Sequence, residues 1–231
     1  MSLPINNFDH QSDLFAALND TVITQLQQAL NERGQASLVV SGGNTPKPLF
    51  ETLSQTELDW SDVTITLADE RWVDPNNADS NERLVRETLL QNQAKPAHFV
   101  SLKTDHDTPE AGMADCNACL MSITRPYDLV LLGMGGDGHT ASLFPCSEQL
   151  TQGLSPQPGQ LCQAVHPTTA PHARMTQTLT ALLNARQIIL LITGKDKLAV
   201  LQQAAAADSP LALPIAAVIN NSAPVTVYYT D

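Results

Sequence analysis

The chain has 231 residues, of which 42% are hydrophobic and 4% aromatic, so aliphatic side chains must form most of its core. Its 24 Asp and Glu residues outnumber its 12 Lys and Arg residues, for a net charge of -12 at pH 7. A surface this acidic repels nucleic acids and anionic membranes. The first 15 residues lack the basic and then apolar pattern of a signal peptide. No apolar stretch reaches the roughly 18 residues of a membrane span. The sequence therefore predicts a cytoplasmic protein that binds neither nucleic acid nor membrane.

The chain begins with a predicted helix and strand. Between Asp9 and Arg33, apolar residues recur at intervals of three and four, which is typical of an amphipathic helix. Gly34 suits the C-terminal cap of that helix. Residues 36–40 then form a short apolar run, which predicts a buried strand.

The loop after this strand is a candidate anion site. Gly42 and Gly43 leave backbone N–H groups accessible, and Asn44 and Thr45 add small polar side chains. We expect Thr45 to cap a following helix that Pro46 begins. Because a helix N-terminus carries unpaired N–H groups and the positive end of the helix dipole, it favours a phosphate. An ordinary strand-to-helix turn is the alternative.

A charged segment follows the next predicted strand. Residues 63–67 alternate and are rich in β-branched side chains, which predicts a strand. Asp69, Glu70 and Arg71 come directly after it. In open α/β sheets, ligands bind at the carboxyl ends of the strands, so these three side chains are candidates for binding or catalysis. A solvated charged loop is the alternative.

The middle of the chain carries three further predicted elements. Ser80 suits the N-cap of a helix at 81–91, and a strand at 96–102 and a helix at 109–123 follow. The last helix contains Cys116-Asn117-Ala118-Cys119. Because no second ligand pair stands at zinc spacing, we expect reduced, structural thiols and no metal site.

The most informative segment starts with the apolar run at 129–132, which predicts a buried strand. Four of the next six residues, 133–138, are glycines, which let the backbone turn and approach a ligand closely. Asp137 and His139 flank the last of these glycines, and we expect residues 140–142 to start a helix. An Asp and a His on a glycine turn at a strand end are candidates for proton transfer.

Two other interpretations of this turn remain open. Residues 133–138 formally match the dinucleotide pattern G-x-G-x-x-G, but they lie in mid-chain and no acidic residue follows about 20 positions later. The turn can also be purely structural with an incidental His. The pairing of Asp137 with His139 around one glycine makes that interpretation the weaker one.

The last third of the chain predicts strands at 162–165 and 187–192 and a helix at 198–207. Two closing strands are expected at 215–219 and 225–229. Strand and helix patterns thus alternate five or six times along the chain. This alternation predicts an α/β fold with a Rossmann-like, mostly parallel sheet and helices on both faces, as a single domain over residues 1–231. We expect a monomer or a weak dimer.

Several polar residues of this region could face a ligand. His166 and His172 flank a stretch rich in Pro and Thr, and we interpret both as loop histidines. Arg174 precedes an apolar run, and Lys195 follows a strand-terminal glycine. A Lys in that position can point at a ligand or simply lie on the surface.

Separated segments of the chain, in the same order, resemble motifs of the 6-phosphogluconolactonase family, whose superfamily includes amino-sugar-phosphate deaminases and isomerases. The similar segments are GMGGDGHTASLFP at 133–145, SGGNTP at 41–46, DERWV at 69–73 with a following Ser-Asn, RMT at 174–176, and the T-G-x-x-K turn at 193–197. The family loop usually has Ser where this chain has Asn44. The resemblance covers nearly the whole chain.

The resemblance implies hydrolysis of 6-phospho-D-glucono-1,5-lactone to 6-phosphogluconate, the second step of the oxidative pentose phosphate pathway, with neither metal nor cofactor. It implies that Arg71 faces the substrate and that Arg174 and Lys195 grip the sugar phosphate above residues 42–45. Asp69 and Glu70 are expected to contact the substrate as well.

The residues fit that chemistry. Hydrolysis of an ester needs a base for water, an acid for the leaving alkoxide and a positive partner for the carbonyl oxygen. His139 can perform both proton transfers because the ordinary pKa of His is near 6.5. Asp137 would orient its ring or raise its basicity, and Arg71 would stabilise the oxyanion or the substrate's hydroxyl groups.

Two rival functions remain. An amino-sugar-phosphate deaminase or isomerase usually carries a G-H-I-A-F-N-E-P type ending, whereas residues 142–145 lack its Glu. A non-catalytic sugar-phosphate-binding module would keep the phosphate loop but would not need Asp137 and His139.

Overall fold

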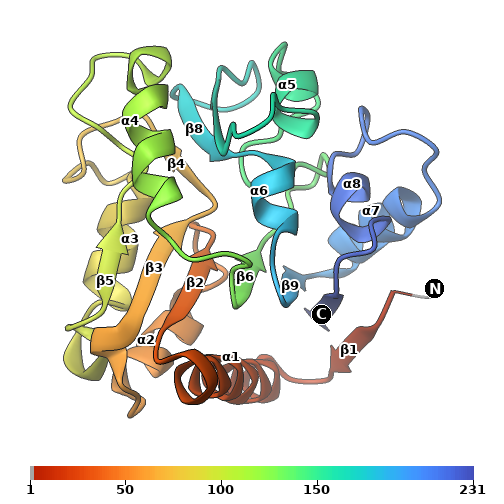
Figure 1. Ribbon diagram of the computed structural model, residues 1–231. Coiled ribbons are helices and arrows are strands. Elements are labelled where there is room, and N and C mark those ends of the chain that lie inside the picture. The colour runs from red at the N-terminus through yellow and green to blue at the C-terminus, as the bar shows by residue number, and fades with distance from the viewer. Residues whose placement is uncertain (1–2) are drawn as a thin grey trace.

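The computed structural model of the protein describes residues 3–231. Its described strands form a seven-stranded parallel sheet and a separate three-stranded antiparallel sheet (Figure 1). The larger sheet contains, in spatial order, β1 (Ile5–Phe8), β10 (Val225–Thr230), β9 (Ile188–Thr193), β6 (Leu129–Leu132), β2 (Ala36–Val40), β3 (Val63–Leu67) and β5 (His98–Val100).

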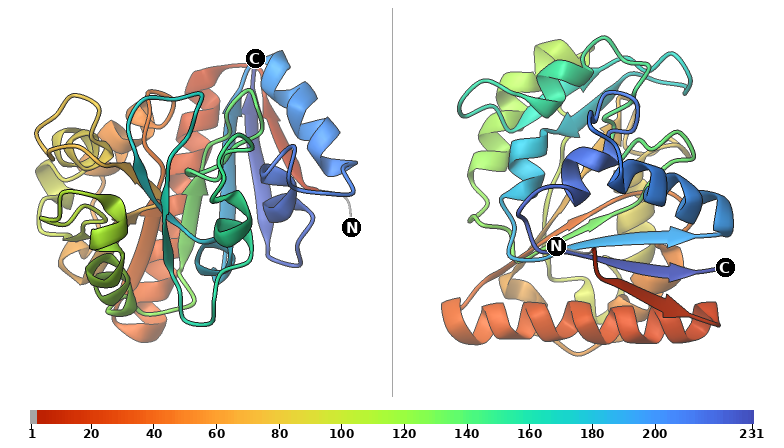
Figure 2. Two further views of the ribbon diagram at one scale, coloured as in Figure 1. Left: turned by 90° about the horizontal axis from the view of Figure 1, so that it is seen from above. Right: turned by 90° about the vertical axis from the view of Figure 1, so that its right-hand side faces the viewer.

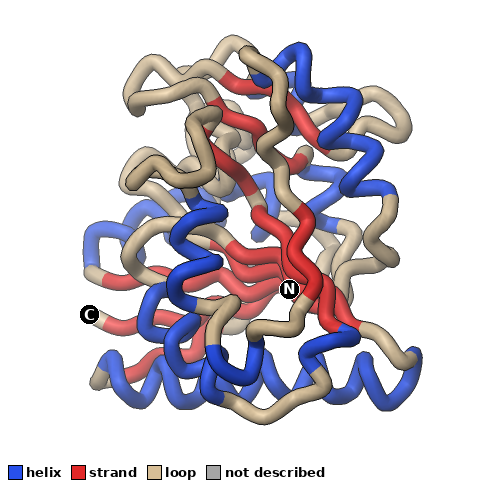
Figure 3. The backbone as a smooth tube through the Cα atoms, turned by 90° about the vertical axis from the view of Figure 1, so that its left-hand side faces the viewer, coloured by secondary structure: helices blue, strands red, loops and turns tan. Residues whose placement is uncertain are grey.

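Helices cover both faces of the larger sheet. Two of them, α1 (Gln11–Arg33) and α2 (Lys47–Gln55), lie on one face, and α6 (Leu179–Leu183), α7 (Lys195–Ala205) and α8 (Ile215–Ile219) lie on the other (Figure 2). Figure 3 shows the strands as a layer between helices. The predicted α/β fold class is therefore confirmed. The remaining helices are α3 (Asn81–Thr88), α4 (Pro109–Met121), α5 (Leu150–Leu154) and the short 3-10 helices η1 (Trp60–Asp62) and η2 (Asn92–Ala94).

The central strands β2 and β6 consist of apolar residues apart from Ser37, because both faces of the sheet are covered. Every residue of β2 and β6 is buried. The amphipathic pattern of α1 places Leu14, Leu18, Val22 and Leu26 in the core at 0% exposure. Gly34 ends this helix in the left-handed region at φ 69°, as predicted.

Three local predictions are wrong. Residues 215–219 form α8 rather than a strand, because five buried apolar residues fit either structure and Pro214 starts a helical turn. Residues 140–142 lie in a loop, in which Ala141 has a φ of 48°. Thr45 does not cap α2, because the helix begins at Lys47 with Pro46 in the N-cap position.

The three-stranded sheet was only partly predicted. It pairs β4 (Asp69–Arg71) with β8 (Arg174–Gln177), and β8 with β7 (Cys162–Val165). β4 and β8 are too short to show a period of two. Their antiparallel register sets Arg71 opposite Arg174.

The described residues offer neither a membrane-spanning helix nor a cluster of metal ligands. Within residues 3–231, no helix is long and apolar enough to cross a bilayer. The same residues contain no group of three or more His, Cys, Asp and Glu side chains that could hold a metal ion. On α4, Cys116 is a buried free thiol and Cys119 an exposed one.

Candidate active site

A cavity of about 440 Å³ lies at the carboxyl ends of β2, β3, β6 and β9. Its lining combines the glycine loop after β2, the second glycine turn after β6, the charged strand β4 and the start of β8. Parallel strands end at the same edge of a sheet, which explains why motifs far apart in sequence meet here. The predicted site residues that line the cavity are Gly42, Gly43, Thr45, Asp69, Arg71, His139 and Arg174.

The glycine loop after β2 approaches the cavity closely. A Cβ atom on Gly42 would lie 1.9 Å from Asn81 Oδ1, so the loop can reach this position only with glycine there. Gly43 has a φ of 89°, in the left-handed region that favours glycine. The hydroxyl of Ser41, which also lines the cavity, is buried without a hydrogen-bond partner in the described structure. Asn44 is exposed and lies outside the cavity lining.

The second glycine turn holds a His–Asp pair. His139 Nδ1 lies 2.5 Å from Asp137 Oδ1, and the same carboxylate accepts the backbone N–H of His139 at 3.2 Å. The imidazole stacks on Phe144 with ring centroids 4.1 Å apart. A Cβ atom on Gly135 would lie 2.2 Å from His139 Cε1, so this glycine makes room for the ring. Because a carboxylate only accepts, it favours the tautomer with hydrogen on Nδ1 and leaves Nε2 as the basic nitrogen.

Arg71 and Arg174 stand opposite each other in the register of β4 and β8, and both line the cavity. Arg71 Nη1 donates to the backbone carbonyl of Asp79 at 2.5 Å, and Arg174 Nη2 donates to that of Pro171 at 3.0 Å. The Nε atoms of both arginines are buried without a hydrogen-bond partner in the described residues. Burial lowers the pKa of Arg174, whose side chain is 7% exposed. Desolvated guanidiniums with unused donors are suited to an anionic ligand.

Asp69 is the carboxylate nearest to Arg174. Its Oδ2 accepts the hydroxyl of Ser142 at 2.5 Å and lies 4.0 Å from Arg174 Nη1. Ser142 follows the second glycine turn, so this contact ties that turn to β4. Ser142 also belongs to residues 142–145, the segment that lacks the Glu of a deaminase-type ending.

Glu70 points away from the cavity, contrary to the prediction. Its carboxylate accepts the backbone N–H groups of Arg71, Asn81 and Glu82 and the hydroxyl of Ser80. Burial raises the pKa of Glu70, and the backbone hydrogen bonds lower it in part. The alternation of side chains along a strand explains the difference, since Asp69 and Arg71 occupy the face opposite to Glu70.

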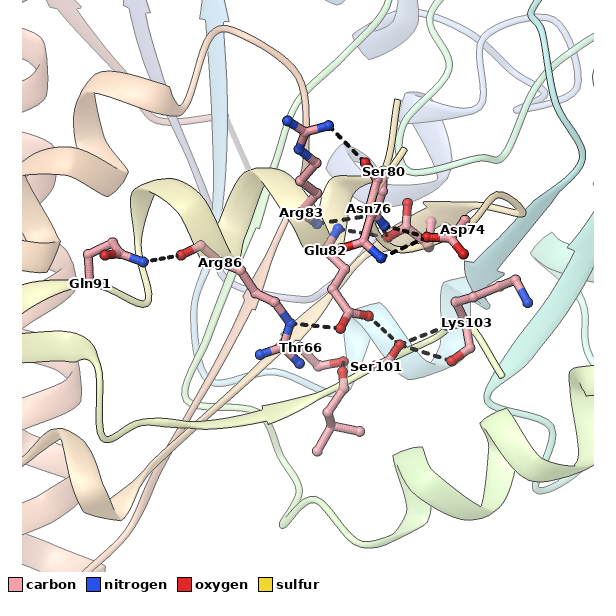
Figure 4. Close-up of polar contacts among 12 residues, drawn as sticks. Thr66, Asp74, Asn76, Ser80, Glu82, Arg83, Arg86, Gln91, Ser101 and Lys103 are labelled. Atoms are coloured by element: carbon pink, nitrogen blue, oxygen red, sulfur yellow. Dashed lines mark hydrogen bonds and ion pairs between the residues drawn. The ribbon is translucent and has the colours of Figure 1, made fainter. Parts of the chain in front are cut away.

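Glu70 thereby fixes the start of α3. Ser80 caps this helix as predicted, because its hydroxyl accepts the N–H of Arg83 at 3.1 Å. Further along, Glu82 contacts Arg86 at 2.8 Å and Ser101 at 2.5 Å (Figure 4). These bonds hold Asn81 at the cavity wall, where its amide donates to the backbone carbonyl of Asp69 at 2.9 Å.

Lys195 is not in the cavity. Its side chain is 82% exposed and its ammonium lies 3.2 Å from Asp231. Lys197 lines the cavity instead, and burial lowers its pKa. The turn motif T-G-x-x-K at 193–197 ends at Lys197, so the correct residue was present in the motif.

Besides Lys197, four other polar residues that line the cavity were not predicted as site residues. Asn81 and His172 were interpreted only as parts of a helix and a loop, and Ser41 and Asp79 were not singled out. The Ser-Asn pair of the quoted motif was a signal for Asn81. His172 and Asp79 lie 93 positions apart, so their contact had no signal in the sequence.

Comparisons with known proteins agree with this geometry. A family model described as "Glucosamine-6-phosphate isomerases/6-phosphogluconolactonase" matches residues 9–228. The chain is 42% identical to a 6-phosphogluconolactonase of Rhizobium meliloti over 230 residues, which cover 99% of each chain. It is 41% identical to one of Pseudomonas aeruginosa over 208 residues, which cover 90% of this chain and 87% of the other.

Solved structures show the same fold. The crystal structure of a 6-phosphogluconolactonase from Shewanella baltica matches with a TM-score of 0.97 and 49% identity, covering 100% of this chain and 98% of that one. A monomeric glucosamine-6-phosphate deaminase has a TM-score of 0.81 at 18% identity, which is a likeness of fold alone. The chain therefore belongs to the glucosamine-6-phosphate isomerase/6-phosphogluconolactonase family.

Proposed function

We propose that the protein is a 6-phosphogluconolactonase that hydrolyses 6-phospho-D-glucono-1,5-lactone to 6-phosphogluconate in the oxidative pentose phosphate pathway. The observation that carries this proposal is His139, paired with Asp137, on the wall of a cavity that also presents two guanidiniums and a Lys. The full-length similarity to 6-phosphogluconolactonases supports it. A deaminase would share this fold, but residues 142–145 of this chain lack the Glu of the deaminase-type ending.

The proton transfers fall to His139. Its Nε2, on the other side of the ring from Asp137, takes a proton from water as the water attacks the lactone carbonyl. The resulting imidazolium then returns a proton to the ring oxygen as the ester bond breaks. Asp137 fixes the ring and stabilises the imidazolium through the 2.5 Å contact.

The cations of the cavity bind the anionic substrate. Arg71 stabilises the oxyanion or the hydroxyl groups near the reacting carbon. Arg174 and Lys197 contact the phosphate above the glycine loop at 42–45, where backbone N–H groups also favour an anion. Three of the chain's 12 Lys and Arg residues thus meet at one cavity, which offsets the repulsion that a net charge of -12 exerts on the substrate.

The proposal is tested with lactone made in situ from glucose 6-phosphate by a dehydrogenase, its decay compared with the spontaneous rate. We expect His139→Ala to lower kcat by about 10²–10⁴-fold with little change in KM, and Arg174→Ala mainly to raise KM. If the wild-type protein fails to accelerate lactone decay, the lactonase proposal is wrong, and glucosamine 6-phosphate is the next substrate to try.

We further propose that the protein acts in the cytoplasm as a monomer or weak dimer. Light scattering of the purified protein at micromolar concentration tests the second part. A stable higher oligomer would contradict it.

A further inference from the structure

One hydrogen bond between side chains joins two loops at the rim of the cavity. Residues 72–80 run from β4 to α3, and residues 166–173 run from β7 to β8. His172 Nε2 lies 2.9 Å from Asp79 Oδ2, and both residues line the cavity. The pair therefore connects two loops whose paired residues lie 93 positions apart in the sequence.

The same two loops hold the two cavity arginines. Arg71 donates to the carbonyl of Asp79, and Arg174 donates to the carbonyl of Pro171, the residue before His172. Asp79 thus fixes Arg71 through its backbone and binds His172 through its side chain. Because β4 and β8 set Arg71 opposite Arg174, the two like charges repel each other and need such external anchors to stay in place.

The backbone at His172 is held in an unusual conformation. Its φ is 67°, in the left-handed region that residues other than Gly uncommonly adopt, although His, like Asn and Asp, is enriched there. Such a conformation persists only where the surroundings determine it. The hydrogen bond with His172 lowers the pKa of Asp79, and the nearby charges of Arg71 and Arg174 act in the same direction.

The loop at 72–80 has its own anchors. Asp74 Oδ1 accepts the backbone N–H and the side-chain amide of Asn76 at 2.8 and 3.0 Å (Figure 4). Arg83 of α3 donates to the carbonyl of Asn76 at 2.8 Å. This loop is thus tied to α3, and the His172–Asp79 pair extends that order to the loop that carries Pro171.

We propose that His172 and Asp79 are positioning residues whose hydrogen bond clasps the two loops, so that Arg71 and Arg174 are held ready for an anionic substrate. The clasp makes the site pre-formed, and substrate binding does not have to order the loops. The inference rests on the proposed function, because its KM measurements use the lactone as substrate.

The chain offers a matched control for this clasp. His166 Nε2, in the same loop as His172, lies 2.5 Å from Glu110 Oε1 of α4. The Glu110 side chain is 53% exposed and that of Asp79 58% exposed, so the two carboxylates are similarly solvated. His166 and Glu110 lie outside the cavity lining and do not contact the arginines.

Asp79→Ala removes the clasp but keeps the backbone carbonyl that holds Arg71. The net contribution of a typical hydrogen bond corresponds to about a fivefold change in an equilibrium constant. We therefore expect KM for the lactone to rise about fivefold and kcat to change less than twofold. The affinity for inorganic phosphate, measured by calorimetry, should weaken by the same factor. Glu110→Ala should leave KM, kcat and phosphate affinity unchanged.

His172→Gly is the second variant, because glycine accepts the positive φ and removes the imidazole. If the clasp is real, Asp79→Ala, His172→Gly and the double variant should share nearly the same KM, since one interaction is lost in each. An unchanged KM and phosphate affinity in both single variants would overturn the inference, as would additive effects or an equal effect of Glu110→Ala. Thermal melting identifies a variant that fails to fold, and the other single variant then decides.

The two proposals fail in different ways. A wild-type protein that does not hydrolyse the lactone would refute the proposed function. The phosphate affinities of the wild type and the variants would still confirm or refute the clasp.

Discussion

Gly42→Ala should disable the cavity while it leaves every charged group in place. The added Cβ would lie 1.9 Å from Oδ1, 2.2 Å from Cγ and 2.7 Å from Nδ2 of Asn81. Real Cβ atoms essentially never come closer than 3.0 Å to such atoms, so the loop and the Asn81 amide must separate by about 1 Å. If Asn81 moves, its hydrogen bond to the carbonyl of Asp69 is lost. If the loop moves, the N–H groups at 42–45 leave the position proposed for the phosphate.

The expected cost follows from that displacement. A misplacement of about 1 Å in a site can lower the rate about 10²-fold, so we expect kcat/KM of Gly42→Ala to fall by about that factor. Overpacking of this kind also costs roughly 1–3 kcal/mol of stability. Steady-state lactone hydrolysis and urea unfolding measure the two quantities.

Gly136→Ala is the control for this variant. Gly136 lies on the second glycine turn, has nothing within 4 Å of an added Cβ and does not have a positive φ, so its substitution should be tolerated. Asn81→Ala removes the clashing amide, and adding Gly42→Ala to it should then cause little further loss. Wild-type kcat/KM in Gly42→Ala, or full additivity with Asn81→Ala, would refute the steric explanation.

Three further predictions concern charged residues. Lys197→Ala should raise KM for the lactone about 10-fold or more, because hydrogen bonds to charged groups contribute roughly 1.5–3 kcal/mol, whereas the exposed Lys195→Ala should change KM less than twofold in the same assay. Glu70→Gln should cost roughly 1–3 kcal/mol in urea unfolding, because an amide cannot accept all four hydrogen bonds that the carboxylate accepts. The pKa of Glu70 is raised in the folded state. The free energy of unfolding that Glu70 contributes should therefore fall as the pH rises from 4.5, the ordinary pKa of Glu, through the folded-state pKa. The Glu70→Gln variant should lack that decline. Asp128→Ala should cost roughly 1.5–3 kcal/mol, because buried Asp128 accepts the N–H of Ser37 and pairs with a guanidinium, and kcat/KM should stay unchanged.

The parts of the fold that the sequence predicted are those with a long or strongly local signal. The helix at 11–33 covers 23 residues, so its periodicity is unmistakable. The strand at 129–132 is short, but four uncharged residues before a glycine turn fit a buried parallel strand. The helix at 215–219 carries a similar run without a period, and there the prediction of a strand was wrong.

The parts of the site that the sequence could not predict depend on pairing between distant residues. Asp69 pairs with Thr176 across more than 100 positions, and this pairing forms the small sheet. The strand alternation in that sheet turns Glu70 towards α3 and Arg71 towards the cavity. Lys195 and Lys197 differ by only two positions in α7, and only the helix geometry decides which one reaches the cavity.

The small sheet explains how an acidic protein can bind an anion. Setting Arg71 opposite Arg174 costs stability, because like charges that are partly desolvated repel each other. The carboxylate of Asp69 and the carbonyls of Asp79 and Pro171 offset part of that cost without neutralising both cations. An anion bound to Arg174, beside Arg71, would offset the remaining repulsion, so the unliganded fold favours the binding of an anion there. Bound phosphate should therefore raise the free energy of unfolding. Variants that loosen either loop should lose part of this phosphate-dependent stabilisation, while their free energy of unfolding without phosphate changes less.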